Sequence, residues 1–376
     1  MSSLPRFSQI NPATIVAELD TILAQNRAEL LLLLSEIISL DWNFIQKLDD
    51  LDDRLQHFWS PINHLHAVKQ TAKLRLAYNE CLAKISAYSS ELSQNSRLYQ
   101  AIKTLDNGDY RFNYAQKKCL HNELRDFHLG GIDLPKAKQK RYQVIQAQLA
   151  QLSNQFEENL LDATANWSKC ISDKSELKGL PTYIIASAEK AAKDKNMSGC
   201  LLSLDYPCYF PVLSYADNRA LRESVYKAYI TRASEFGNMA FDNSPIMFKI
   251  LNLRHELSQL LGFKNYAQKS LASNKMAKTP EEVLSFLENL LRCTQSKADA
   301  EWQALYNFAQ SRDQIDTLQP WDILYYREKL QEKMFGICDD TLRCYFPVEK
   351  VLSGLFKLIH DLFGMQIQEI KEVDVW

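Results

Sequence analysis

Residues 135–167 read PKAKQKRYQVIQAQLAQLSNQFEENLLDATANW, and this stretch decides the fold. Its larger apolar side chains recur at steps of three and four residues, at Tyr142, Ile145, Leu149, Leu152, Phe156, Leu160, Ala163 and Trp167. That spacing lays one apolar stripe along about seven turns of an α-helix. Because neighbouring helices must cover such a stripe, the sequence predicts a largely helical protein.

Other helices are predicted from prolines and capping residues that stand where a helix begins. Proline in a first turn costs little, because its missing N–H would have no partner there, and Asn or Asp just before a helix accepts hydrogen bonds. These signals predict helices at 11–39, from Asp41 onward, at 113–129, 211–236, 244–261, 280–310 and 320–334, and from Phe346-Pro347 onward. Gly130-Gly131 ends the helix at 113–129, so we expect that helix and the next to form an antiparallel hairpin.

Two segments break the helical pattern. Residues 199–215 combine the apolar run Leu201-Leu202-Ser203-Leu204 with two prolines and several aromatic side chains, which favours a short strand or extended chain, and we expect a second short strand at 365–370. Only 10 of 376 residues are glycine, which disfavours a fold rich in tight β-turns. The predicted class is mainly α, a multi-helix fold with a small extended or β element around 199–210.

No linker or internal repeat marks a sharp domain boundary. The loop before Gly199 is the best candidate. We therefore expect an N-terminal helical region at 1–198, which contains the long hairpin helices, and a second helical region at 199–376.

Charge and hydropathy exclude several classes of partner. The chain has 44 basic and 46 acidic residues and a formal net charge of -2, which gives no electrostatic basis for binding nucleic acid or an anionic membrane. Residues 1–6 lack the basic and apolar segments of a signal peptide, and the longest pure leucine run, Leu30 to Leu34, is far below the roughly 18 residues of a membrane span. We expect a cytoplasmic protein without nucleic-acid or membrane partners.

The cysteines indicate no disulfide framework and no zinc ribbon. No two of them form a Cys-x-x-Cys pair, and scattered cysteines in such a chain are usually reduced and buried. They are Cys81, Cys119, Cys170, Cys200, Cys208, Cys293, Cys338 and Cys344.

One segment approaches a metal-binding motif. His255-Glu256-Leu257-Ser258-Gln259 lies in a predicted helix and follows His-Glu-x-x-His until its last position. Zinc needs two imidazoles one turn apart with the glutamate beside the bound water, and the amide of Gln259 is a poor ligand. We interpret the segment as a helix face that packs on a neighbour and carries polar side chains on its solvent side.

The remaining histidines give no metal site. His64 and His66 are two residues apart, which turns them away from each other on a helix, whereas an extended chain would place both on one side. His121 and His128 share a helix face but lie roughly 10 Å apart along it. Neither pair has the spacing of two ligands to one ion.

Acidic and aromatic clusters favour structural interpretations. Asp49, Asp50, Asp52 and Asp53 are interpreted as a solvated helix face or helix start. Trp321-Asp322 with Tyr325-Tyr326 suits a peptide-binding groove, but aromatic side chains at this helical spacing are more often core residues. Gly-x-Ser-x-Gly, Gly-x-x-x-x-Gly-Lys and Gly-x-Gly-x-x-Gly are all absent from the sequence, which disfavours a serine hydrolase or a nucleotide-binding protein.

Eight segments in one order carry a family resemblance that covers essentially the whole chain. Together they resemble the oligopeptidase A and thimet oligopeptidase family of zinc metallopeptidases. The segments are 58–65 (FWSPINHL), 124–127 (LRDF), 131–135 (GIDLP), 209–212 (YFPV), 229–234 (YITRAS), 253–266, 318–322 (LQPWD) and 373–376 (VDVW).

The resemblance implies a mostly helical ellipsoid split by a deep channel, in which a zinc ion at the floor hydrolyses short peptides. Residues 199–376 would form part of the channel wall. In that family the zinc motif His-Glu-Phe-Gly-His and the other catalytic residues lie beyond the position that matches Trp376. We therefore assign no catalytic and no metal-binding residue, leave the substrate-binding residues unknown, expect no bound zinc, and predict that this chain alone is inactive.

Two alternatives stay open beside an oligopeptidase cut short. The chain is a non-catalytic module that binds peptides or a protein partner, or it is one half of a split enzyme. Helix faces left uncovered by the truncation would also favour self-association.

Overall fold

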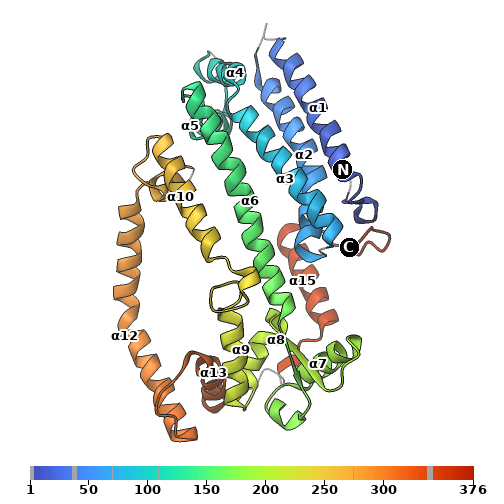
Figure 1. Cartoon of the computed structure of the whole chain (residues 1–376), viewed down its shortest axis with the longest axis vertical. Helices are drawn as coiled ribbons and strands as arrows, with labels where there is room; N and C mark the ends of the chain where they lie inside the picture. The colour runs from blue at the N-terminus through green and yellow to red at the C-terminus, as the bar shows by residue number, and fades with distance from the viewer. Residues whose placement is uncertain (1–3, 36–39, 70, 109, 274, 337–341) are drawn as a thin grey trace. The chain divides into compact units, whose positions relative to one another are not determined.

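The computed structural model describes residues 4–35, 40–69, 71–108, 110–273, 275–336 and 342–376 (Figure 1). These residues are mainly helical with a small two-stranded sheet, so the predicted fold class is confirmed. The helices are α1 Ile15–Ser35, α2 Trp42–Val68, α3 Ala72–Ser93, α4 Ser96–Asn107, α5 Tyr114–Leu129, α6 Lys136–Asn166, α7 Thr182–Asp194, α8 Tyr206–Tyr215, α9 Arg219–Ile230, α10 Ser244–Leu260, α11 Tyr266–Ala272, α12 Pro280–Asp313, α13 Pro320–Phe335 and α15 Val348–Phe363. The strands are β1 Ser168–Ile171 and β2 Cys200–Ser203, and short 3-10 turns span Phe7–Gln9, Lys174–Leu177 and Met239–Phe241.

Helices introduced by a first-turn proline or a capping side chain are confirmed. Asp41 accepts a hydrogen bond from the N–H of Asn43 at the start of α2, and Asn113 forms a reciprocal capping box with Gln116 at the start of α5. Helices α6, α10, α12, α13 and α15 lie where they were predicted. The end expected for the first helix, at 36–39, lies outside the described residues.

The extended segment expected at 199–215 is correct only for its first part. Strand β2 covers Cys200–Ser203 and pairs antiparallel with β1, with Ile171 opposite Cys200 and Ser168 opposite Ser203. From Tyr206 the chain is helical, so the expectation for the rest of the segment is wrong. Pro207 stands in the first turn of α8, where a proline is tolerated, and Pro211 lies inside this short helix.

Two further expectations are corrected. The helix predicted at 211–236 is interrupted after Tyr215, because Asn218 starts a new helix by accepting a hydrogen bond from the N–H of Leu221. That helix ends at Ile230, and Ala233 then takes a positive φ of 52°. The strand predicted at 365–370 is wrong, because these residues are irregular and pair with no strand among the described residues.

The chain divides into two compact units. Unit 1 comprises Met1–Gln155, Ile246–Leu284 and Ile370–Trp376, and unit 2 comprises Phe156–Pro245 and Ser285–Glu369. The boundary predicted between residues 198 and 199 stays a prediction.

Unit 1 is built on α1, α2 and α3, which pack side by side (Figure 1). Two core clusters hold these helices: Leu19 and Cys81 are completely buried between α1, α2 and α3, and Leu105 and Leu120 are completely buried where α4 and α5 pack on α1 and α2. The first half of the apolar stripe of α6 packs against α10 in the same unit, where Tyr142, Ile145, Leu257 and partly buried neighbours form a separate cluster. The Tyr142 hydroxyl of α6 also donates a hydrogen bond to the carbonyl of Leu129 at the end of α5. The antiparallel hairpin of α5 and α6 stays a prediction.

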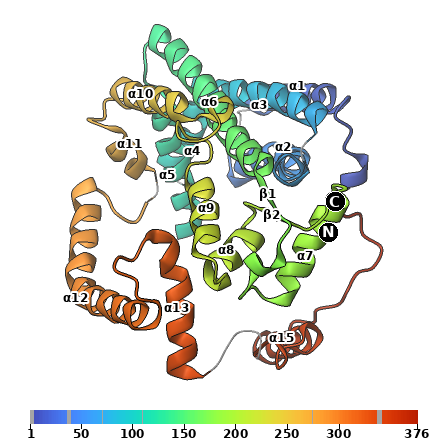
Figure 2. The ribbon, with the colours of Figure 1, turned by 60° about the horizontal axis from the view of Figure 1, so that its bottom comes forward.

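Unit 2 surrounds the small sheet. Helices α7 and α8 pack on β2 (Figure 2), and their core holds Leu202, Val212 and Val225 with essentially no exposure. Trp167, the last residue of the stripe, packs against this core. Among the described residues, no helix has the length and apolar character that crossing a membrane requires.

Candidate functional site

The side chains of the near-motif on α10 make packing and helix-capping contacts. Arg141 donates two hydrogen bonds of 2.6 Å to the carboxylate of Glu256, and the hydrogen bond to this guanidinium lowers the pKa of Glu256. Leu257 is buried in the α6–α10 cluster. The amide of Gln259 donates to the carbonyls of residues 263 and 264 just beyond the helix end, and His255 is exposed. This segment therefore positions α10 on α6.

Replacing Glu256 with glutamine is expected to lower the free energy of unfolding by less than about 1 kcal/mol, because exposed ion pairs contribute little. The side chains of Arg141 and Glu256 are 42% and 41% exposed. Urea titration of both proteins measures the change, and metal analysis should find the same zinc content in each. A variant that loses bound zinc would contradict the structural role of Glu256.

The histidines considered as metal ligands have different neighbours. His64 and His66 lie on α2, so the helical alternative holds: His64 packs edge-on against Trp376 with ring centroids 4.9 Å apart, whereas His66 stacks on Tyr78 at 3.8 Å. His128 forms a hydrogen bond with Asp133. Among the residues that the structure describes, no three His, Cys, Asp or Glu side chains are grouped to hold a metal ion.

The Trp321 to Tyr326 segment belongs to the core of unit 2. Tyr325 and Tyr326 are 5% and 2% exposed and pack against Phe308 of α12. Withdrawal from solvent raises the pKa of the Tyr325 hydroxyl to about 12, helped by its hydrogen bond to Asp217. These buried rings do not present a peptide-binding surface, which agrees with the core interpretation.

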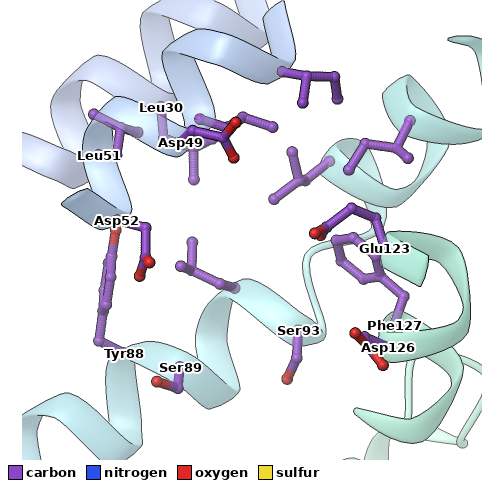
Figure 3. A pocket seen from close by; sticks show the side chains of 15 residues that line it. Leu30, Asp49, Leu51, Asp52, Tyr88, Ser89, Ser93, Glu123, Asp126 and Phe127 are labelled. Atoms are coloured by element: carbon purple, nitrogen blue, oxygen red, sulfur yellow. The ribbon is translucent and has the colours of Figure 1, made fainter. Parts of the chain in front are cut away.

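A pocket of about 350 Å³ lies within unit 1, where α1, α2, α3, α4 and α5 converge. We call it the acid-rimmed pocket. Figure 3 shows Asp49 and Asp52 of α2 facing it from one side and Glu123 and Asp126 of α5 from the other. Its remaining lining residues are uncharged: Leu30, Ile45, Leu48, Leu51, Tyr88, Ser89, Leu92, Ser93, Leu98, Ile102 and Phe127.

The four carboxylates differ in their partners. Asp126 accepts two hydrogen bonds of 2.9 Å from Arg125. Asp49, Asp52 and Glu123 form no ion pair with any residue in the described ranges. Partial withdrawal from water, followed by the charges of neighbouring carboxylates, raises the pKa of Asp49 and of Glu123.

Sequence reasoning found only part of this pocket. The spacing of Asp49 and Asp52 places both on one face of α2, and they were interpreted as solvated surface. Glu123 and Tyr88 carried no local signal. They reach the pocket only because α3 and α5 pack beside α2, which the sequence does not specify.

Comparison with known proteins matches the chain over its whole length. Residues 212–376 match the family model "Peptidase family M3", and residues 19–139 match "Neurolysin/Thimet oligopeptidase, N-terminal domain". Oligopeptidase A of Salmonella typhimurium is 45% identical over 100% of this chain and 56% of the relative, and oligopeptidase A of Escherichia coli K12 is 44% identical over 99% and 55%. The organellar (chloroplastic/mitochondrial) oligopeptidase A of Arabidopsis thaliana is 34% identical over 97% and 47%.

The chain thus spans about half the length of the curated relatives that it matches. A crystal structure of a "putative oligoendopeptidase F" from Bacillus anthracis superposes with a TM-score of 0.52 at 14% identity, covering 81% of this chain and 48% of that one, which supports the fold. The family resemblance drawn from the eight sequence segments is confirmed. The chain belongs to peptidase family M3 and corresponds to the N-terminal part of an oligopeptidase A-like protein.

Proposed function

We propose that this chain supplies the N-terminal part of a cytoplasmic zinc oligopeptidase that hydrolyses short peptides. The observation that carries the proposal is the 45% identity to a bacterial oligopeptidase A across the entire chain. The described residues do not themselves fit a zinc ion, because they offer no group of three suitable ligands. The seven histidines of the sequence also include no pair four residues apart. The catalytic step therefore requires polypeptide that matches the remainder of the relatives.

Two helices of unit 2 support an association with such polypeptide. None of the residues of α15 is buried, although Val348, Leu352, Leu355 and Leu362 line one face at helical spacing with exposures of 44 to 73%. Helix α12 likewise exposes Leu287, Leu290, Leu291 and Trp302. Large exposed apolar patches are typical of interaction surfaces.

A complementation experiment tests this function. The 376-residue chain is mixed with a polypeptide equivalent to the uncovered part of the Salmonella relative, and hydrolysis of a quenched fluorescent peptide of about ten residues is followed with and without a chelator. We expect the chain alone to be inactive and the mixture to cleave at least about 10²-fold faster than either half, because metal and preorganised groups supply effects of this size. A folded mixture without chelator-sensitive cleavage would refute the proposal.

Matched variants of α15 test the docking surface. Leu355→Lys places a charge on the apolar face and is expected to abolish complementation, whereas Ser353→Lys introduces the same charge on another side of the helix and should retain it. Helical content measured by circular dichroism serves as the folding control for both variants.

The same exposed faces favour self-association when no such polypeptide is present. Sedimentation of the isolated chain at increasing concentration measures it. A strictly monomeric chain at high concentration would contradict this second candidate property while leaving the peptidase proposal intact.

A further inference from the structure

Another pocket of about 350 Å³ lies within unit 2, beside the loop that connects α9 to α10. Apolar side chains, among them Trp167, Leu204 and Phe241, form much of its wall. Asn166 and Asn238 also line it and are exposed, so the pocket opens to solvent. At about 30 Å³ for a water-sized group, its volume holds roughly a dozen atoms.

Of the described residues that line this pocket, Arg232 alone is charged, and we call it the Arg232 pocket. The central carbon of the guanidinium lies 3.5 Å from the centre of the Tyr229 ring, and Nη1 donates a hydrogen bond of 3.2 Å to the carbonyl of Tyr229. The Tyr229 ring stacks in turn on the buried ring of Tyr209, with centroids 3.8 Å apart. The guanidinium is therefore held in a fixed plane.

The edge of this guanidinium that carries Nε and Nη2 has no partner within the described parts of the chain. Nε is buried without a hydrogen bond, Nη2 forms none and is not enclosed, and no carboxylate forms an ion pair with Arg232. A buried donor that is left unpaired costs free energy, and a charged one costs more. These donors favour an acceptor that enters from the pocket.

The chemistry of the lining narrows the kind of acceptor. The parallel N–H groups of this edge match the two oxygens of a carboxylate, the pairing that arginine favours. One arginine balances a single negative charge, which disfavours a phosphate dianion. The apolar wall favours a hydrophobic body attached to the charged group. A cation is repelled, and a neutral molecule gains only the apolar contact.

We propose that the Arg232 pocket binds a monocarboxylate with an apolar body, whose oxygens accept hydrogen bonds from Nε and Nη2 of Arg232 while the body packs against Trp167, Leu204 and Phe241. Because Nε has almost no accessible surface, the acid contacts Nη2 first and draws this edge toward the pocket. A free organic acid and the carboxyl end of a peptide share this chemistry. Binding does not require the proposed peptidase activity.

Calorimetric titration of the 376-residue chain with 3-phenylpropanoate at neutral pH tests the charge requirement. Its counterparts 3-phenylpropanamide and 3-phenylpropylammonium keep the apolar body and remove or reverse the charge. We expect saturable binding of the carboxylate at least about tenfold tighter than that of the amide, because hydrogen bonds between charged groups are the stronger ones, and weaker binding still of the ammonium. Equal affinities for the three, or no saturation of the folded protein by the carboxylate, would overturn the proposal.

Variants assign the binding to Arg232. Arg232→Met should weaken carboxylate binding at least about tenfold and change amide binding less than about threefold, because only the charged head group loses its partner. Lys227→Met is the matched control: Lys227 is a 59% exposed cation of the same helix region outside the pocket lining, and its loss should change carboxylate binding less than about threefold. Circular dichroism checks folding. Unchanged carboxylate affinity in folded Arg232→Met would refute the site.

A measurement on the unaltered guanidinium keeps the test decisive if Arg232→Met does not fold. The Nε–H resonance of Arg232 in ¹⁵N-labelled protein is identified by its absence in Arg232→Lys. It should shift as 3-phenylpropanoate saturates the protein and stay in place with the amide. An unshifted resonance at saturation would show that the acid binds elsewhere.

Two peptides distinguish the sources of the ligand. N-acetyl-Gly-Phe ends in a free carboxylate beside an apolar side chain, and N-acetyl-Gly-Phe-amide lacks that charge. Binding of the acid that depends on Arg232 and falls at least about tenfold on amidation identifies a peptide carboxyl end as a ligand. Binding of 3-phenylpropanoate without binding of either peptide identifies a free organic acid.

Discussion

Replacing Asp322 with alanine is expected to lower the free energy of unfolding of unit 2 by about 3–5 kcal/mol, the loss typical of breaking a buried ion pair from one side. The carboxylate is completely buried and accepts hydrogen bonds from Arg219, from Arg222 at 2.9 Å and from the N–H of Gln319 at 3.0 Å. Arg222 is itself only 1% exposed. Its charge would remain buried without a carboxylate partner. Hydrogen exchange at α9 and α13, together with urea unfolding, measures the loss.

Arg219 provides the matched control. It binds the same carboxylate at 2.7 Å, but its side chain is 42% exposed, so Arg219→Met should cost no more than about 1 kcal/mol. Arg222→Met should instead resemble Asp322→Ala, because the buried guanidinium also donates to the carbonyls of residues 216, 217 and 321, which would lose this donor together with the carboxylate. Similar losses in the Arg219 and Asp322 variants would show that burial of the pair does not determine its contribution.

The contribution of Asp322 to the free energy of unfolding is expected to decrease in acid. Burial acts to raise the pKa of Asp322, but the hydrogen bonds from Arg219, the Gln319 N–H and Arg222 outweigh it, and the pKa is lowered. Its contribution is therefore complete above the unfolded-state value of about 3.9 and disappears only as the pH falls further, through the folded-state pKa. The stability difference between wild type and Asp322→Ala should stay constant from pH 7 to about 4 and narrow below that.

Gly179→Ala is expected to be as damaging, at about 3–5 kcal/mol, through strain and overpacking together. Gly179 has a φ of +91°, and an added Cβ would lie 2.3 Å from the carbonyl oxygen of Tyr215 and 2.8 Å from the carboxylate of Asp217. A backbone oxygen cannot rotate away as a side chain does. The loop between the 3-10 turn at Lys174–Leu177 and α7 would have to move, and thermal and urea unfolding measure the cost.

The matched variant at Gly336 separates backbone strain from overpacking. It also has a positive φ, +64°, at the end of α13, but an added Cβ would meet no atom within 4 Å. Gly336→Ala should therefore show the conformational strain alone, about 1–2 kcal/mol. If the two alanine variants lose the same stability, the close approach at Gly179 contributes nothing.

Local signals predicted the helices well because a helix is held by contacts within a few residues of its own sequence. Asp41, Asn113 and the first-turn proline of α13, Pro320, mark starts that the structure reproduces. Helix α6 could be predicted from the periodicity of its apolar stripe alone. The near-motif at His255 could be interpreted for the same reason. Gln259 stands where the second zinc-binding histidine would be, only one helical turn away.

Features made by distant residues could not be predicted. Strand β1 exists because Ser168–Ile171 pairs with Cys200–Ser203, about thirty residues later, and nothing within either tetrapeptide specifies the other. At Tyr206–Tyr215, packing of the apolar side chains in the core of unit 2 favours a helix that contains two prolines. The acid-rimmed pocket draws on several helices, so its acidic residues looked like separate surface charges in the sequence.

Segments of the two units alternate along the chain, and this alternation fixes the order in which their contacts can form during translation. Ser8 donates two hydrogen bonds to Asp374, a residue that the ribosome adds 366 positions later. At about 5–20 residues per second, the amino end waits roughly 20–70 s for this partner. The early helices of unit 1 have their own core residues within 1–155, whereas the segment Ile370–Trp376 joins this unit only after residues 156–245 and 285–369 of unit 2 have been translated.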